Sequence, residues 1–187
     1  MENVVVVGHP INNINFRDLK ADEIEVRVQQ IFDEKGITLL LYKNARVDQI
    51  ILDEAVGNLN WQKHYSRDNA NCIVSIWDNT KKQWIEKEDT GTESFSEAEK
   101  GLASDSFKRS CFNWGIGREL YTAPFIWIKW QDLEKTEKDS KTGKYKLKDS
   151  FEVEKIKIKD KKITCLSIVN QKRKRVFTYT EQVLEEA

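Results

Sequence analysis

The stretch Ser96 to Tyr121, SEAEKGLASDSFKRSCFNWGIGRELY, predicts one long helix with a clear beginning and end. Ser96 is a favoured N-cap residue, and Glu99 follows it at the spacing of a capping box. Gly115 comes directly after the last helical positions, where glycine ends many helices. Small and apolar residues recur between these ends at helical spacing, so we expect this face to lie close against a sheet. The residues of the face are Ala98, Leu102, Ala103, Ser106, Phe107, Ser110, Cys111 and Trp114.

Three basic residues of this helix, Lys100, Lys108 and Arg109, lie on a different side from its apolar face. A helix packed on a sheet with cations along one edge could present them to phosphates. The helix taken alone favours the simpler interpretation, which is a charged face in contact with solvent.

The composition limits the class of protein. The chain has 187 residues, suits one domain or one domain with an appendage, and has 39% hydrophobic and 33% charged residues. Lys plus Arg and Asp plus Glu both number 31, so the net charge is zero. A wholly basic nucleic-acid coat is excluded, but a local patch is not. Residues 155–175 carry such a local excess, with nine Lys or Arg against Asp160 alone.

The cysteines Cys72, Cys111 and Cys165 are odd in number, far apart and set in apolar stretches, which predicts three buried free thiols. A chain without a disulfide framework or a signal peptide fits a reducing cytoplasm. No apolar run approaches the roughly 18 residues that span a bilayer. We therefore expect a cytoplasmic protein without a membrane partner.

The first half of the chain predicts a helix, a strand, a second helix and a meander. The apolar positions from Leu19 to Glu34 fit an amphipathic helix, and Ile37 to Tyr42 fit a buried strand. Asn44 can cap a helix that ends at Gly57, with Val47, Ile50, Ile51 and Ala55 facing inward. Strands at 61–67, 72–77 and 83–88 then lead into the long helix, and we expect the strand at Ile37 to join their sheet.

The second half predicts a strand at 123–130, a mobile charged loop at 132–148, and a hairpin of 151–158 with 163–169. A third strand at 176–179 and a helical turn in the acidic tail complete the prediction. The fold class is α+β, with an antiparallel β-β-β-α core, a flanking N-terminal helix and a C-terminal β-hairpin. We divide the chain into an N-terminal arm (1–18), a core (19–130), a charged loop (131–149), and a basic hairpin with an acidic tail (150–187).

The sequence offers little for catalysis. His9 and His64 have no metal-ligand spacing to other residues, and Gly115-Ile116-Gly117 follows a helix where a phosphate loop would open one. Carboxylates such as Asp48, Asp53 and Glu54 could bind Mg²⁺ in a nuclease, although in a chain this charged they are more often plain surface. We predict no catalytic residue, no metal and no cofactor.

Cations together with many aromatic residues are what single-stranded nucleic acid requires, since cations follow the backbone and rings stack on bases. The chain has six Trp and five Tyr. Core packing explains Trp61, Trp77, Trp84 and Trp114 equally well, so the aromatic signal alone is weak.

The order of three motifs is more specific than any one of them. The blocks are Leu41 to Val47, Gly57 to Trp61, and Ser96 to Gly115, the last with Ser104-Asp105-Ser106-Phe107-Lys108-Arg109. From Leu39 to Tyr121 the chain resembles the N-terminal domain of single-strand annealing proteins of the Rad-fifty-two type, including their phage relatives. The third block resembles the (Thr/Ser)-Asp-x-(Leu/Phe)-Lys-Arg pattern of that family. The chain departs from it at Phe112, where the family often has a further basic residue.

The resemblance implies a ring-forming homo-oligomer that binds single-stranded DNA and anneals complementary strands without ATP, in phage or prophage recombination and repair. The DNA-binding residues that it implies are Arg46, Lys100, Lys108 and Arg109. A single-strand-binding protein and an exonuclease are the further partners considered, and the host cytoplasm is the expected location. Three alternatives remain: a coating module that does not anneal, a Mg²⁺-dependent nuclease, and a structural protein without a nucleic-acid role. The basic hairpin could form a second DNA surface, a subunit contact or a lysine-protected sheet edge.

Overall fold

The computed structural model describes residues 14–92, 98–134, 136–143 and 145–181, without the side chains of 98–100. The chain folds into two compact units, and each unit is formed by two separate segments of the sequence. The meander unit comprises residues 1–17 and 48–116, and the six-stranded unit comprises residues 18–47 and 117–187. Each unit has its own sheet and its own core.

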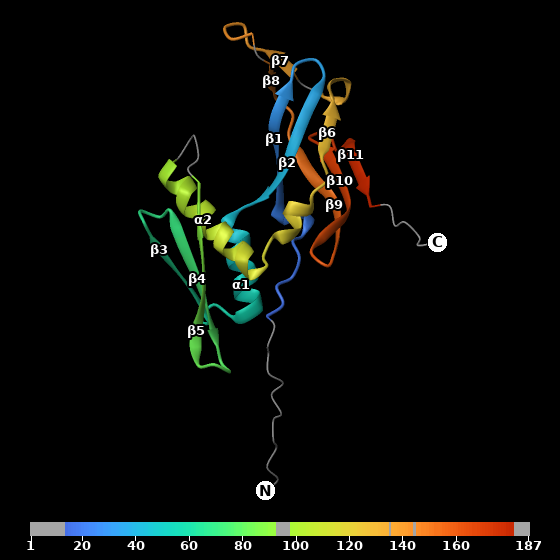
Figure 1. Cartoon of the computed structure of the whole chain (residues 1–187). Coiled ribbons are helices and arrows are strands. Elements are labelled where there is room, and N and C mark those ends of the chain that lie inside the picture. The colour runs from blue at the N-terminus through green and yellow to red at the C-terminus, as the bar shows by residue number, and fades with distance from the viewer. Residues whose placement is uncertain (1–13, 93–97, 135, 144, 182–187) are drawn as a thin grey trace, which may run out of the picture. The chain divides into compact units, whose positions relative to one another are not determined.

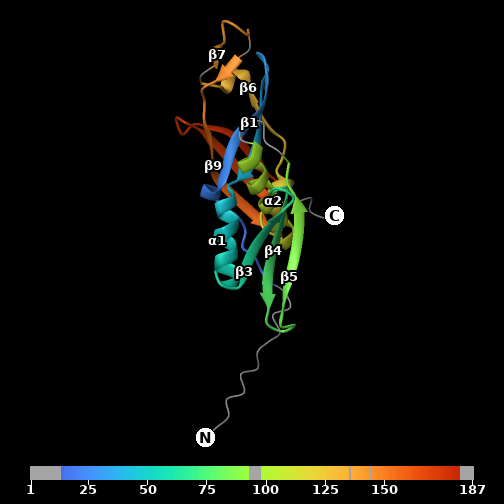
Figure 2. The same cartoon turned by 90° about the vertical axis from the view of Figure 1, so that its left-hand side faces the viewer.

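The meander unit contains the β-β-β-α core that the sequence predicts. Strands β3 (Trp61–Ser66), β4 (Asn71–Asp78) and β5 (Gln83–Thr90) form an antiparallel sheet in the order β3-β4-β5. Helix α2 (Ala98–Trp114) packs on β4 and β5 (Figures 1 and 2). The apolar side chains of β4 alternate with the strand's period of two, and Cys72, Val74 and Ile76 are buried.

Small residues let α2 approach the sheet closely. The hydroxyl of Ser110 donates to the carbonyl of Lys87 at 2.6 Å and accepts from the Val74 amide at 3.2 Å, so it bridges two strands. The hydroxyl of Ser106 donates to the carbonyl of Asn69 at 3.0 Å. A Cβ added at Gly91 would lie 2.5 Å from the Ser106 amide nitrogen, so only glycine fits there. The expected close helix–sheet packing is confirmed.

Helix α1 (Ala45–Val56) begins and ends where the sequence predicts. The side chain of Asn44 accepts the Arg46 amide at 3.0 Å as an N-cap, and Gly57 follows the helix with a φ of 82°. Val47, Ile51 and Leu52 are buried. The prediction that Ile50 and Ala55 face inward is wrong, because both side chains are exposed. Asp48 and Leu52 of the same helix are buried instead.

The main sheet of the six-stranded unit is antiparallel, in the order β11-β10-β9-β1-β2-β6. Its edge strands β6 and β11 contact each other, so the sheet curls toward closure (Figure 1). The strands are β1 (Ile24–Phe32), β2 (Gly36–Lys43), β6 (Ile126–Lys129), β9 (Phe151–Lys159), β10 (Lys162–Asn170) and β11 (Arg175–Thr180). Short 3₁₀ helices are η1 (Ala21–Glu23), η2 (Arg118–Thr122) and η3 (Trp130–Asp132).

Alternating apolar residues of these strands form the core of the six-stranded unit. Ile37, Ile128 and Ile163 are at most 1% exposed, and they come from β2, β6 and β10. The β9–β10 hairpin and the third strand β11 are confirmed, and the turn residues Asp160 and Lys161 take φ values of 53° and 60°. These left-handed values are those of a type I′ hairpin turn.

Four predictions in this unit need correction. The residues from Leu19 to Glu34 are η1 and β1 and not a helix, because Ile24, Val26 and Val28 alternate with charged residues and pair with β2. The strand at Ile37 belongs to this sheet and not to the meander. The strand predicted at 123–130 is shorter, since β6 covers only Ile126–Lys129 and η3 begins at Trp130. The predicted loop at 132–148 contains the hairpin β7 (Thr136–Lys138) with β8 (Tyr145–Leu147).

Some predictions lie outside the described residues: the N-terminal arm up to residue 13 with His9, the Ser96 cap, and the helical turn of the acidic tail. Among the cysteines, Cys72 and Cys111 are buried as predicted, whereas Cys165 is only partly so. No helix among the described residues is long and apolar enough to cross a membrane. The α+β class is confirmed.

Candidate nucleic-acid interface

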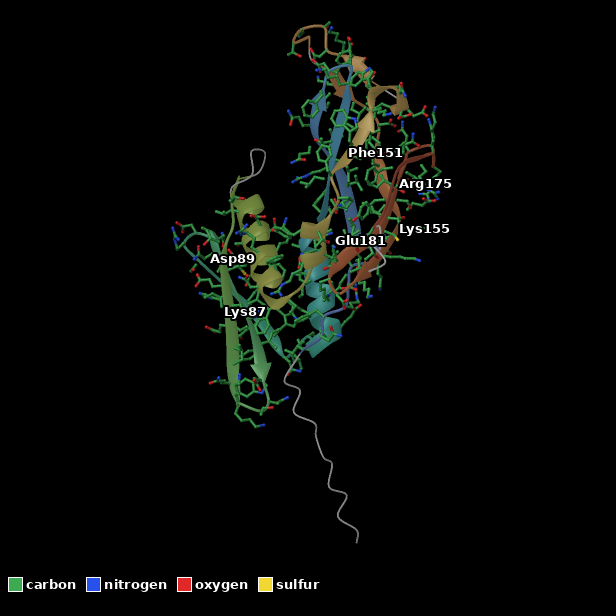
Figure 3. All side chains as sticks on the ribbon, turned by 45° about the vertical axis from the view of Figure 1, so that its right-hand side comes forward. Lys87, Asp89, Phe151, Lys155, Arg175 and Glu181 are labelled. Atoms are coloured by element: carbon green, nitrogen blue, oxygen red, sulfur yellow. The ribbon has the colours of Figure 1, made fainter. Side chains whose placement is uncertain are left out.

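Lys108 and Arg109 each lie beside a carboxylate of the meander unit. The Nε of Arg109 is 3.3 Å from Oδ1 of Asp89 on β5, and the Arg109 side chain is 44% exposed. The Nζ of Lys108 is 3.8 Å from Oδ1 of Asp105, one helical turn earlier. Figure 3 shows Asp89 on β5, near the helix. The two cations of the Lys-Arg motif therefore lie along the β5 side of α2 with their charges locally balanced.

The two carboxylates are held in place by further hydrogen bonds. Asp105 accepts the amide and the hydroxyl of Thr92 at 3.0 and 3.2 Å. Asp89 accepts the side-chain amide of Asn113 at 3.2 Å. These contacts fix the acids, and the acids in turn orient Lys108 and Arg109. Because the ion pairs are partly exposed, each is worth only about 0–1 kcal/mol, so a phosphate can compete with the carboxylate for the cation.

Two further lysines border α2, and no sequence motif points to them. Lys63 of β3 and Lys87 of β5 are both paired with Val74 of β4, one on each side. The Nζ of Lys63 lies 4.6 Å from the centroid of the Phe107 ring. The Nζ of Lys87, which Figure 3 labels on β5, lies 4.6 Å from the centroid of the Trp114 ring and donates to the Asn113 carbonyl at 2.8 Å. Because both lysines pair with Val74 in the strand register, Lys63 and Lys87 lie at the border of α2.

Arg46 and Lys100 are not brought to Lys108 and Arg109 by described contacts. Arg46 is exposed in the first turn of α1 and belongs to the six-stranded unit. No carboxylate of the described residues forms a salt bridge with Arg46. Lys100 lies in α2, two turns before Lys108, but its side chain is outside the described residues. The assignment of both residues to the interface stays a prediction.

The aromatic residues near α2 are mostly packed. Trp61 stacks on Phe107 with ring centroids 6.2 Å apart, and its indole donates to Asp53 at 2.7 Å. The indole of Trp114 donates to the Val74 carbonyl at 3.0 Å. Trp84 packs edge-on against Trp77 and is 37% exposed. Trp84 is therefore the tryptophan of this unit most open to a base.

The acidic residues considered for a nuclease do not form a metal site in the described part of the chain. Asp48 is fully buried, Asp53 accepts the Trp61 indole, and Glu54 pairs with Arg17. No group of three or more His, Cys, Asp or Glu side chains among the described residues could hold a metal ion. The arrangement offers cations, which can bind phosphates, and aromatic rings, which can stack on bases.

A helix that carries a Lys-Arg pair against a meander bordered by further lysines places several cations close together, as the binding of a polyanion requires. Residues 52–140 match the model of the family described as Rad52/22 family double-strand break repair protein. The match covers just under half of the chain and includes the meander and α2, so the resemblance to the Rad-fifty-two type is confirmed. No curated protein and no solved structure matches the chain significantly.

The description of the matching family names double-strand break repair. The matched residues contain two of the three sequence blocks, including Lys108 and Arg109. The first block, Leu41 to Val47, lies before them. The assignment of Arg46 therefore rests on the sequence resemblance alone.

Proposed function

We propose that this protein binds single-stranded DNA and promotes the annealing of complementary strands without ATP, as an oligomeric ring. The observation that carries the proposal is the Lys108–Arg109 pair on α2, within the segment that matches the Rad52/22 family. The phage or prophage branch of recombination is part of the proposal. A single-strand-binding protein and an exonuclease are its further candidate partners.

In the proposed mechanism the cations exchange carboxylates for phosphates. Lys108 and Arg109 leave Asp105 and Asp89 and contact two phosphates of one strand, while Lys63 extends the basic border on the β3 side. Lys100 would continue the track along α2, and Arg46 would contact the backbone from the start of α1. Contacts to phosphate and sugar leave base edges free, so the strand can meet its complement.

In annealing of this kind the protein acts as a template, and no covalent bond is made or broken. Two strands repel each other through their phosphates, and bound cations reduce this repulsion. A strand held in an extended form also has fewer conformations to lose when pairing begins. Productive pairing nuclei would then form more often, and no ATP is required.

The coating module is the alternative that uses the same cations, so the test must measure pairing as well as binding. Two labelled complementary oligonucleotides are mixed with the protein, without ATP or added metal, and fluorescence transfer is followed over time. We expect the protein to accelerate transfer and Lys108→Ala with Arg109→Ala to abolish the acceleration. A matched control is Lys81→Ala with Lys82→Ala, which removes the same charge from the β4–β5 turn.

The salt dependence of single-strand binding gives a second readout. Losing two phosphate contacts should lower the slope of log affinity against log salt by about 1.4, since each contact on a single strand contributes about 0.7. Normal binding by the α2 double variant would show that the interface is wrongly placed. Binding without acceleration would favour the coating module, and cleavage that EDTA abolishes would favour the nuclease.

A further inference from the structure

The meander sheet has one face on which α2 does not pack, and we term it the open face. Successive strand residues point to opposite faces, so the residues between the buried Cys72, Val74 and Ile76 lie on the open side. The strand register extends these positions to β3 and β5. The open face consists of Gln62 and His64 of β3, Ile73, Ser75 and Trp77 of β4, and Trp84, Glu86 and Glu88 of β5.

The charges of the meander are divided between its two faces. Lys63 and Lys87 belong to the α2 side, together with Asp89, which Figure 3 labels on β5 beside Lys87. The strand positions of the open face carry Glu86 and Glu88 and no lysine or arginine. Like charges brought together across an interface are unfavourable, so this face repels a phosphate backbone. The open face therefore fits a partner of positive charge.

The two carboxylates of the open face are held by uncharged donors. Oε1 of Glu86 accepts the hydroxyl of Ser75 at 3.2 Å, and Oε1 of Glu88 accepts the side-chain amide of Asn71 at 2.6 Å. Both glutamates are exposed, and no cation of the described residues forms a salt bridge with either of them. The carboxylates are thus oriented before a partner arrives, and they keep their charge for an external cation.

A tryptophan pair borders these carboxylates on the same face. Trp77 and Trp84 are cross-strand partners with ring centroids 5.5 Å apart, and Trp84 is 37% exposed. The indole of Trp77 donates to the side chain of Asn79 at 3.0 Å, which fixes that ring. The face of a tryptophan ring attracts a guanidinium or ammonium group, and exposed tryptophans often anchor protein partners. The open face therefore combines an aromatic anchor with negative charge.

Trp84, Glu86 and Glu88 occupy every second position of β5. Successive members are roughly 7 Å apart along the strand, because each residue rises by about 3.3 Å. Basic side chains at alternate positions of an extended segment have the same spacing. Such a segment can place one cation over the Trp84 ring and one against each glutamate, as in a cross-strand pair of opposite charges.

Protection of the sheet edge explains the glutamates but not the tryptophans. Charged side chains on an edge strand prevent pairing with another chain, and β5 is an edge of the meander. Trp77, however, lies on the central strand β4, and its contact with Trp84 leaves more than a third of the Trp84 side chain exposed. A large ring exposed among charges indicates an interaction surface.

We propose that the open face binds an extended, arginine- or lysine-rich segment of another protein. The surface lies on the side of the sheet opposite to α2, and its charge is opposite to that of the Lys108–Arg109 pair. A partner bound there leaves both cations of α2 available. The proposal therefore does not depend on the proposed annealing function.

The test uses the full chain and two labelled peptides of identical composition. In the first peptide four arginines alternate with four threonines, and in the second the four arginines form one block. Fluorescence anisotropy at low salt measures their binding to the wild type, to Glu86→Gln with Glu88→Gln, and to Trp84→Leu. A matched control, Asp22→Asn with Asp33→Asn, removes the same charge from exposed acids of the six-stranded unit. Sedimentation of each protein alone is measured in parallel.

We expect the alternating peptide to bind about three- to five-fold tighter than the block peptide, because one more exposed ion pair can form. The glutamate variant should lose about ten-fold in affinity for the alternating peptide, and Trp84→Leu about three-fold. The control should bind as the wild type does. Oligonucleotide binding should not weaken in the glutamate variant, since glutamine keeps the oxygens that accept from Ser75 and Asn71 and leaves α2 unchanged.

Three results would overturn the proposal. Equal affinity for the two peptides would mean that the open face does not recognise an extended segment in register. An equal loss in the control would attribute the binding to net charge. A loss of self-association in the glutamate variant, with peptide binding unchanged, would assign the open face to a second copy of this chain.

Discussion

Carboxylates that are themselves held by hydrogen bonds balance the charges of Lys108 and Arg109. Lys108 and Arg109 stand in a local pattern of six residues. Asp89 lies on a different element, and its place beside Arg109 depends on how α2 packs against β5. The positions of Lys63 and Lys87 depend on the strand register in the same way. A local motif could therefore name the cations but could not show that their charges are balanced.

This balance leads to a prediction for Asp89→Asn. The substitution removes the negative charge beside Arg109 and keeps an oxygen that can accept from Asn113. We expect single-stranded DNA to bind about two- to five-fold tighter, because an exposed ion pair worth up to about 1 kcal/mol no longer competes with phosphate. Fluorescence anisotropy at low salt would measure the change.

The control for this prediction is Asp33→Asn, which changes the same charge at an exposed turn of the other unit. An equal gain in Asp33→Asn would attribute the effect to net charge. Weaker binding by Asp89→Asn would mean that the carboxylate chiefly orients Arg109, and the exchange of carboxylate for phosphate would then be wrong.

At the scale of elements, the segment from Leu19 to Glu34 shows how a helical spacing and a strand alternation of apolar residues can compete. Its apolar residues fit a helix at every third or fourth position, but Ile24, Val26 and Val28 also alternate, and β-branched residues favour strands. The pairing partner decides between them. β2 is an adjacent apolar strand joined by a tight turn with Glu34 at a φ of 60°, so tertiary pairing prevails over the helical pattern.

The β7–β8 hairpin was missed for a different reason. Its charge density suggested a loop, but the turn signals were present in the sequence. Asp139 accepts the amides of Lys141 and Thr142 at 2.9 and 3.0 Å, and Gly143 takes a φ of 68°. An Asx turn followed by glycine is typical of a reversal between two strands. Tyr145 packs on Trp130 with ring centroids 4.7 Å apart, which anchors the hairpin.

The packing of α2 on the meander predicts the effect of Ser110→Ala. Without the hydroxyl, the buried Val74 amide loses its side-chain acceptor and the Lys87 carbonyl loses a donor. We expect the free energy of unfolding to fall by about 1–3 kcal/mol. Ser104→Ala is the control, because its hydroxyl donates only to Gly101 of the same helix at 3.1 Å.

Urea denaturation of both variants would measure this difference. Ser104→Ala should lie within about 0.5 kcal/mol of the wild type. Equal stability of the two variants would show that the strand contacts of Ser110 contribute little, and that apolar burial of Phe107 and Cys111 alone holds the helix.

At the scale of the whole molecule, the sequence could not show how the chain is shared between two units. The six-stranded sheet joins β1 to β9, which are more than 100 residues apart, with the entire meander inserted between β2 and β6. Neighbours in sequence usually pair, so local rules predict that the strand at Ile37 joins the nearer sheet. No local sequence feature distinguishes a strand that pairs with the next strands of the chain from one that pairs with a strand beyond an inserted segment.

Buried groups under α2 predict how the stability of the protein depends on pH. Burial raises the pKa of the Cys72 thiol from 9.0 to about 11 and that of the Tyr65 hydroxyl from 10.0 to about 12. Both groups are neutral in the folded protein at neutral pH. The unfolded chain releases these protons at lower pH than the folded one, so the stability is complete below about pH 9 and is lost as the pH rises toward 11.

Thermal unfolding between about pH 7.5 and pH 10.5 tests this expectation. The melting temperature of the wild type should fall steeply above about pH 9, and Cys72→Ala should flatten that fall while lowering the melting temperature at every pH through the lost packing. Cys165→Ala, at a partly exposed thiol, should keep the steep profile. Parallel profiles for Cys72→Ala and the wild type would mean that the buried thiol is not the titrating group. The alkaline loss would then have to come from Tyr65 or from the lysine ion pairs, and Tyr65→Phe would decide between these two.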